Sequence, residues 1–166
     1  MYTGSCYIGV VGPESGPYNA MASILNIARR DGDGVPVPIY ATKGYEARQQ
    51  HFNKFMASEH DFMLLLDHDM IFERDTLERL RAWGKPYISG LYMRRRFSPM
   101  MPIWFEPWGG EWPYRWYLDI PERGRLHPIG ASGWGCILIH REVVQETRKI
   151  LKGEPDVLED DMDVWP

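Results

Sequence analysis

The sequence predicts an α/β protein built on a mostly parallel β-sheet with helices on both faces. One observation is that residues 1–92 alternate between apolar runs of strand length and longer segments with apolar residues at helical spacing. Another is the run 62–66, where five consecutive apolar residues are typical of a strand buried on both faces. With 166 residues, the chain has the length of a single domain and can bury a core without disulfides.

The elements expected in residues 1–92 follow the order βαβαβαβ. Pro36 and Pro38 each remove a hydrogen-bond donor from the second strand, which predicts that this strand lies at a sheet edge. The third helix is expected to be N-capped by Asp75, with Glu78 in the capping-box position and Trp83 in the core at its end. The predicted ranges are 6–11, 18–30, 35–40, 45–58, 62–66, 76–83 and 87–92.

The pattern changes in residues 93–128, which are rich in proline and aromatic residues and show little periodicity. Tryptophans recur there every four residues from Trp104 to Trp116, but the prolines and glycines between them exclude a regular helix, so we expect a loop region. Residues 129–166 are expected to add a strand at 135–140, a helix at 141–151 and an acidic, irregular end. The inward positions of that last helix are Val143, Val144, Thr147 and Ile150.

Composition excludes several classes of function. A net charge of −4 lacks the basic footprint of nucleic-acid-binding proteins. The longest apolar stretch is far shorter than the roughly 20 residues of a membrane-spanning helix, and no signal peptide is recognisable at the N-terminus. Cys6 and Cys136 both lie in apolar runs, which indicates reduced core residues and a cytoplasmic location.

Two carboxylates, Asp67 and Asp69, directly follow the most apolar strand. Ligands of open parallel sheets bind outside the carboxyl ends of the strands, so these residues lie where a ligand is expected. Mg²⁺ and Mn²⁺ take one or two carboxylates together with substrate phosphates, which makes a metal–diphosphate site the preferred interpretation over a solvated turn. The glycines at 9, 12 and 16 imitate a dinucleotide fingerprint, but Val11 stands where its second glycine belongs.

Residues 44–96 resemble the nucleotide-sugar-binding half of a GT-A glycosyltransferase, and family 2 is the most similar. The matching features are Ala47-Arg48 at a helix start, the apolar strand ending in the Asp-x-Asp motif, and the leucine-containing helix after it. Residues 133–141 (GWGCILIHR) resemble the family segment that borders the acceptor pocket, and Glu159-Asp160 resembles its "ED" motif. The resemblance implies the GT-A fold, which is Rossmann-like.

The resemblance also implies how the donor is held. Asp67 and Asp69 would bind Mn²⁺ or Mg²⁺, which bridges the diphosphate of a UDP- or GDP-sugar. Arg48 would direct a positive charge toward the phosphates, although an ordinary exposed helix arginine is the alternative. Pro13 and Glu14 would lie beside the nucleoside, in the loop after the first strand.

Catalysis would fall to the C-terminal segment. By resemblance, Asp160 would be the general base that takes the proton of the acceptor hydroxyl in an inverting reaction, unless residues 154–163 are only a solvated acidic tail. Trp134, Gly135 and Glu159 would bind the acceptor, a carbohydrate or another hydroxyl compound; a core position is the alternative for Trp134.

The function expected from these features is metal-dependent transfer of a sugar from a nucleotide-diphosphate sugar to a hydroxyl acceptor. Residues 93–128 would form a partly mobile lid over the donor, with the basic run 94–96 facing phosphate. The alternative is a non-catalytic nucleotide- or sugar-binding protein on a truncated transferase fold. Another chain or an oligomer is a possible source of the missing part of the acceptor site.

Overall fold

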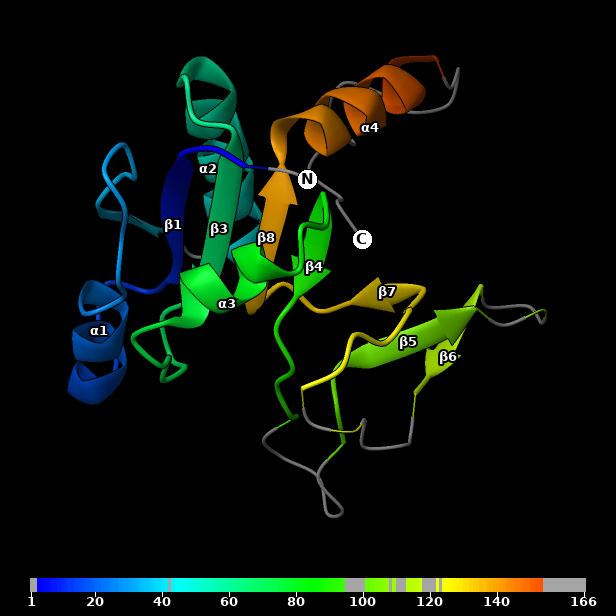
Figure 1. Cartoon of the computed structure of the whole chain (residues 1–166), viewed down its shortest axis with the longest axis horizontal. Helices are drawn as coiled ribbons and strands as arrows, with labels where there is room; N and C mark the ends of the chain where they lie inside the picture. The colour runs from blue at the N-terminus through cyan, green and yellow to red at the C-terminus, as the bar shows by residue number, and fades with distance from the viewer. Residues whose placement is uncertain are drawn as a thin grey trace.

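The computed structural model describes residues 3–41, 43–94, 101–107, 109, 113–117, 122 and 124–153, and it is an α/β protein as predicted. Helices and strands alternate along the N-terminal half, and three short strands precede the last strand–helix unit (Figure 1). The elements are β1 (Cys6–Gly12), α1 (Tyr18–Leu25), β2 (Pro36–Tyr40), α2 (Gly44–Ala57), β3 (Phe62–Asp67), α3 (Thr76–Ala82), β4 (Tyr87–Ser89), β5 (Trp104–Pro107), β6 (Tyr114–Trp116), β7 (Ala131–Ser132), β8 (Cys136–His140) and α4 (Arg141–Gly153).

The main sheet has the strand order β2-β1-β3-β8-β4 and is mixed, whereas the sequence predicted a mostly parallel sheet. β1 pairs in parallel with β2 and β3, whereas β8 runs antiparallel to both β3 and β4. The chain leaves β4 at its carboxyl end and passes through β5, β6 and β7, which lie beside that edge (Figure 1). β8 therefore enters the sheet at the carboxyl ends of the parallel strands, and for this reason it runs antiparallel to its neighbours. β2 is an outermost strand of this sheet, so its predicted position at a sheet edge is confirmed.

Helices cover both faces of the main sheet, as predicted. β3 supplies side chains to both faces because alternate residues of a strand point in opposite directions. Leu64 belongs to the cluster that includes Ile24 of α1 and Leu77 of α3, and Leu65 belongs to the cluster that includes Phe55 of α2. All five residues of the apolar run are buried, so the prediction of a strand covered on both faces is confirmed.

Arg141 joins the start of α4 to the end of α2. Its guanidinium donates hydrogen bonds to the carbonyl oxygens of Phe55, Met56, Ser58 and His60, at 2.6–3.2 Å. These carbonyls lie at or just beyond the C-terminus of α2, where a helix leaves its last acceptors unpaired. The arginine of the GWGCILIHR segment therefore has a structural contact of its own.

Several local predictions were wrong. α1 ends at Leu25 because the chain then turns, and the N–H of Ala28 donates to the carbonyl of Arg74 at 2.7 Å. Asp75 is the N-cap residue of α3, as predicted, but its side chain makes no cap hydrogen bond, so the predicted capping box is absent. Trp83 is 42% exposed at the end of α3. Ile150 is 61% exposed because it lies beyond the part of α4 that contacts the sheet, whereas Val144 is buried as predicted.

The loop predicted around Trp104 and Trp116 is instead an antiparallel sheet in the order β6-β5-β7. Pro107, the last residue of β5, is the partner of Tyr114, the first residue of β6. The proline therefore lies at the end of the paired strands and does not interrupt the pairs before it. The rings of Phe105 and Trp116 meet across the two strands, with centroids 4.6 Å apart. Cross-strand aromatic pairs of this kind stabilise a small sheet. The four-residue spacing of the tryptophans does not match the two-residue repeat of a strand, so these strands were not predicted.

Cys6 and Cys136 are free and buried, as predicted. Burial raises the pKa of each thiol to about 12, so neither is reactive as a thiolate near neutral pH. In the part of the chain that the structure describes, no helix is long and apolar enough to cross a membrane.

Candidate functional site

Three segments of the chain meet at the carboxyl edge of the main sheet. The N–H of His68, just after β3, donates to the carbonyl of Val11 near the end of β1, at 2.9 Å. The N–H of Asp67 donates to the carbonyl of Gly135, just before β8, also at 2.9 Å. The Asp-x-Asp motif, the end of β1 and residues 133–135 just before β8 (the β8 entrance) are therefore neighbours, although they are far apart in the sequence.

An ion pair lies at the centre of this edge. Arg48 Nη2 of α2 donates to Asp67 Oδ1 at 3.0 Å, and the two side chains are 25% and 29% exposed. Burial raises the pKa of Asp67 above its ordinary value, and nearby Asp69 raises it further, while the charge and hydrogen bond of Arg48 oppose them. Since the net shift is upward, Arg48 does not fully compensate the carboxylate.

Arg48 lies against the first turn of α2 because Gly44 leaves room for it. A Cβ atom at Gly44 would come within 2.9 Å of Arg48 Nη1. The Nε of Arg48 is buried and has no hydrogen-bond partner in the described part of the chain. Glycine four residues before arginine was a usable sequence signal, since these positions share one face of a helix.

His51 holds α2 against β1 one turn after Arg48. Its Nε2 donates to the carbonyl of Val10 at 3.1 Å, and its Nδ1 accepts from the hydroxyl of Tyr7 at 2.9 Å. A carbonyl can only accept, so the proton of the neutral ring lies on Nε2. Burial lowers the pKa of His51 to about 4, which keeps the ring uncharged near neutral pH. A Cβ at Gly9 would lie 2.6 Å from Nδ1, so this glycine makes room for the ring.

The loop after β1 lies directly beside the Asp-x-Asp motif. Cβ atoms at Gly12 and Gly16 would come within 2.0 and 2.6 Å of the His68 ring. Those glycines leave room for the imidazole ring of His68. Pro13 and Glu14, the predicted nucleoside neighbours, are exposed on this loop.

Tyr92 belongs to the same edge, although the sequence analysis missed it. Its hydroxyl accepts the N–H of Gly135 at 3.0 Å. A Cβ at Gly133 would be 2.1 Å from that hydroxyl, so the glycine allows the tyrosine to cross the β8 entrance. Burial raises the pKa of Tyr92 to about 12, and the charges of Asp67 and Arg48 reach it with opposite signs. The GWG sequence could have signalled such a close approach.

Trp134, the predicted acceptor platform, contacts the core on one side. Its ring meets Phe52 of α2 edge-on, with centroids 5.7 Å apart, and it packs against the buried cluster under α2 and α4. The tryptophan also lines a large groove, so it has both a structural contact and an accessible side.

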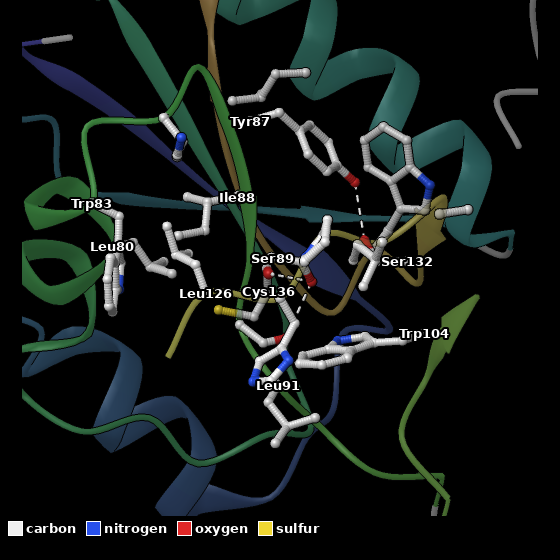
Figure 2. A pocket seen from close by; sticks show the side chains of 18 of the residues that line it. Leu80, Trp83, Tyr87, Ile88, Ser89, Leu91, Trp104, Leu126, Ser132 and Cys136 are labelled. Atoms are coloured by element: carbon white, nitrogen blue, oxygen red, sulfur yellow. Dashed lines mark hydrogen bonds between the residues drawn. The ribbon is translucent and has the colours of Figure 1, made fainter. Parts of the chain in front are cut away.

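This groove has a volume of about 1630 Å³ and is lined by residues of α3, β4, α4 and the small sheet, together with the loops between them. Figure 2 shows its labelled side chains, with the hydroxyls of Tyr87 and Ser132 joined across it by a hydrogen bond of 3.0 Å. Met70, Gly90 and Trp134 line its end next to the carboxyl edge. Its lining is predominantly apolar and aromatic, with a few hydroxyl groups, as is usual for ligand pockets.

The donor set at the edge suits a hard divalent cation. Asp67 and Asp69 are carboxylates two positions apart at the end of β3, and the charge of Asp69 reaches Asp67. Within the described ranges, no three side chains of the His, Cys, Asp and Glu types come together as a metal cage. Mg²⁺ and Mn²⁺ seldom need one, because phosphates and water complete their coordination. The residues present therefore fit a cation that arrives with a diphosphate.

The predicted base Asp160 and its neighbour Glu159 lie outside the described residues, as do Arg95 and Arg96. Arg94 is described, and its guanidinium lies over the ring of Trp116, 5.3 Å from the centroid.

No protein-family model matches the chain, and no curated protein sequence matches it. Among solved structures, it is similar to the crystal structure of A197 from STIV, with a TM-score of 0.56 over 86% of this chain and 67% of that chain. The two sequences are 14% identical, so the likeness concerns the fold alone.

Proposed function

We propose that this protein is a metal-dependent glycosyltransferase with a GT-A-like fold, which transfers a sugar from a nucleotide-diphosphate sugar to a hydroxyl acceptor. The observation that carries the proposal is the convergence of Asp67, Asp69 and Arg48 at the carboxyl edge of the sheet, beside the loop after β1. Two carboxylates and a guanidinium at one edge are suited to a cation and a diphosphate together.

Each group at the edge has a distinct part in donor binding. Asp67 and Asp69 would hold the cation, which neutralises charge on the departing nucleoside diphosphate. Arg48 would donate hydrogen bonds to phosphate oxygens, since a guanidinium matches their geometry. The exposed loop with Pro13 and Glu14 would border the nucleoside.

The acceptor would approach from the groove. This groove adjoins the Asp-x-Asp edge at Met70 and Trp134, so a molecule lying in it can bring a hydroxyl toward the donor. Aromatic rings such as Trp134 suit the apolar faces of sugars. Consecutive hydrogen bonds link Tyr92 to Gly135 and Gly135 to Asp67, and Gly135 follows the groove residue Trp134 in the chain. These bonds would hold the end of the groove at a fixed distance from the donor.

The proton of the acceptor hydroxyl requires a base, and Asp160 remains the proposed one. Asp160→Asn is expected to lower turnover by roughly 10²–10⁴-fold while nucleotide affinity changes little. Asp161→Asn is the control, and a larger loss in that variant would move the base by one position. Equal, small effects in both variants would remove the base assignment.

The experiment that tests the function combines binding and turnover. Calorimetry with UDP and GDP, with Mn²⁺ or with EDTA, is expected to show nucleotide binding that needs the cation. A panel of nucleotide sugars with Mn²⁺ then identifies the donor from slow hydrolysis. Metal-dependent binding without hydrolysis or transfer of any donor would favour a non-catalytic binding protein, and the absence of nucleotide binding would refute the proposal.

A further inference from the structure

Arg48 and a divalent cation need the same carboxylate. Arg48 Nη2 already donates to Asp67 Oδ1 at 3.0 Å, and Asp67 is one of the two carboxylates proposed to hold the cation. A cation on either oxygen of Asp67 repels the guanidinium that is hydrogen-bonded to Oδ1, because like charges repel at close range. Binding of the cation therefore weakens the contact between Arg48 and Asp67 and favours the withdrawal of Arg48.

The surroundings of Arg48 allow such a withdrawal. The pair is about a quarter exposed on both sides, so solvent and ligands reach it. Arg48 Nε has no hydrogen-bond partner among the residues that the structure describes, so this part of the guanidinium is unsatisfied there. Gly44 lets the guanidinium lie close to the first turn of α2, since a Cβ atom at this position would come within 2.9 Å of Nη1.

We propose that Arg48 exchanges partners: it neutralises Asp67 when the site is empty and moves to the diphosphate when a cation takes Asp67. The exchange rests on the proposed function, because it requires a diphosphate ligand. Arg48 then opposes the cation when it arrives alone and favours the cation–nucleotide complex. Such coupling is reciprocal, so the cation and the nucleotide strengthen each other's binding.

The first test measures Mn²⁺ binding without nucleotide, from the magnetic-resonance signal of free Mn²⁺. Arg48→Gln is expected to bind Mn²⁺ about 2- to 5-fold more tightly than the wild type, because a partly exposed ion pair no longer competes. The same variant is expected to bind UDP with Mn²⁺ roughly 10- to 100-fold more weakly, since a charged hydrogen bond to phosphate is lost. These opposite signs distinguish exchange from a purely structural role.

Arg79→Gln is the matched control for this test. Arg79 is an exposed arginine that contacts Glu73 and Asp75, so its loss removes the same charge without touching Asp67. If Arg48→Gln and Arg79→Gln change both affinities alike, long-range charge explains the effect and the exchange is overturned.

The second test measures UDP binding in EDTA. Asp67→Asn frees Arg48, so metal-free UDP affinity is expected to rise, and more than in Asp69→Asn. The latter removes a charge two residues away but leaves the hydrogen bond between Arg48 and Asp67 in place. Equal affinities in the two variants would overturn the exchange while leaving the proposed function intact. Failure of UDP and GDP to bind under every condition would instead remove both proposals.

Discussion

Two arginine–aspartate pairs occupy opposite ends of the main sheet and differ in what surrounds them. Arg81 and Asp33 lie near the amino end of β1 and are only 5% and 1% exposed. Arg48 and Asp67 lie at the carboxyl end and are 25% and 29% exposed. The first pair is enclosed by protein, whereas the second remains open to a ligand.

The partners of the two aspartates show the same contrast. Asp33 accepts hydrogen bonds from the N–H groups of Cys6 and Arg30 as well as from Arg81. Burial alone would raise the pKa of Asp33, but these hydrogen bonds hold it below its usual value. Asp67 has fewer donors, and its pKa is raised. A carboxylate with a full set of donors stabilises the fold, whereas one left short of positive charge is available for binding.

The largest expected effect is the loss of stability in Asp33→Asn. This substitution removes the buried carboxylate that pairs with Arg81 and leaves Arg81 with the more exposed carboxylate of Glu78, at 2.9 Å. Breaking a buried ion pair typically lowers the free energy of unfolding by about 3–5 kcal/mol. Urea denaturation measures it, and Asp31→Asn is the control because Asp31 is exposed two residues earlier. Equal midpoints for the two variants would show that the buried pair contributes nothing particular.

The next effect is on binding, at the other end of the sheet. Asp67→Asn is expected to lower Mn²⁺-dependent nucleotide affinity roughly 10- to 100-fold without lowering the free energy of unfolding. Burial disfavours the ionised carboxylate of Asp67, and Arg48 offsets this cost only in part. Removal of the charge therefore relieves a cost to the folded state. Calorimetry and urea denaturation of the same sample check both parts. A loss of stability as large as that of Asp33→Asn would abolish the contrast between the pairs.

A smaller effect is expected for Tyr92→Phe. It leaves the N–H of Gly135 without its acceptor, at a cost of about 1–2 kcal/mol in the free energy of unfolding. Tyr87→Phe is the control, since it removes a hydroxyl pair with Ser132 on the exposed side of the groove. If Tyr87→Phe is the more destabilising variant, Tyr92 does not hold the β8 entrance.

The smallest effect is the dependence of stability on pH, and it has opposite signs for the two aspartates. The folded-state pKa of Asp67 is raised, so the unfolded chain ionises first and stability falls as pH rises from about 3.8 to the folded value. The stability gained by Asp67→Asn over the wild type should grow in that window. The folded-state pKa of Asp33 is lowered, so its contribution is present above about 3.8 and disappears as pH falls through the folded value. Parallel stability–pH curves for wild type and Asp67→Asn would contradict this sign.

Local patterns were sufficient to predict much of the main sheet. The apolar run that became β3, the prolines that put β2 at an edge and the Asp-x-Asp motif at a strand end all depend on residues close together in sequence. Burial imposes these patterns directly on the chain, because a strand covered on both faces has no polar side chain to spare.

Other features depended on contacts that no local pattern contains. β8 runs antiparallel because the chain returns from the small sheet at the carboxyl edge. The glycines at 9, 12 and 16 admit the rings of His51 and His68, which come from other elements. Tyr92 lies at the site because its hydroxyl contacts the GWG segment, where it accepts the N–H of Gly135.

The sequence by itself determined the α/β class, the buried strand and the carboxylates at its end. It could not determine which arginine–aspartate pair supports the fold and which faces a ligand. The residue types are identical, and the partners are 48 positions apart in one pair and 19 in the other. Only the tertiary structure encloses Asp33 among backbone donors and leaves Asp67 at an open edge, and that difference in solvation gives the same chemical pair two different roles.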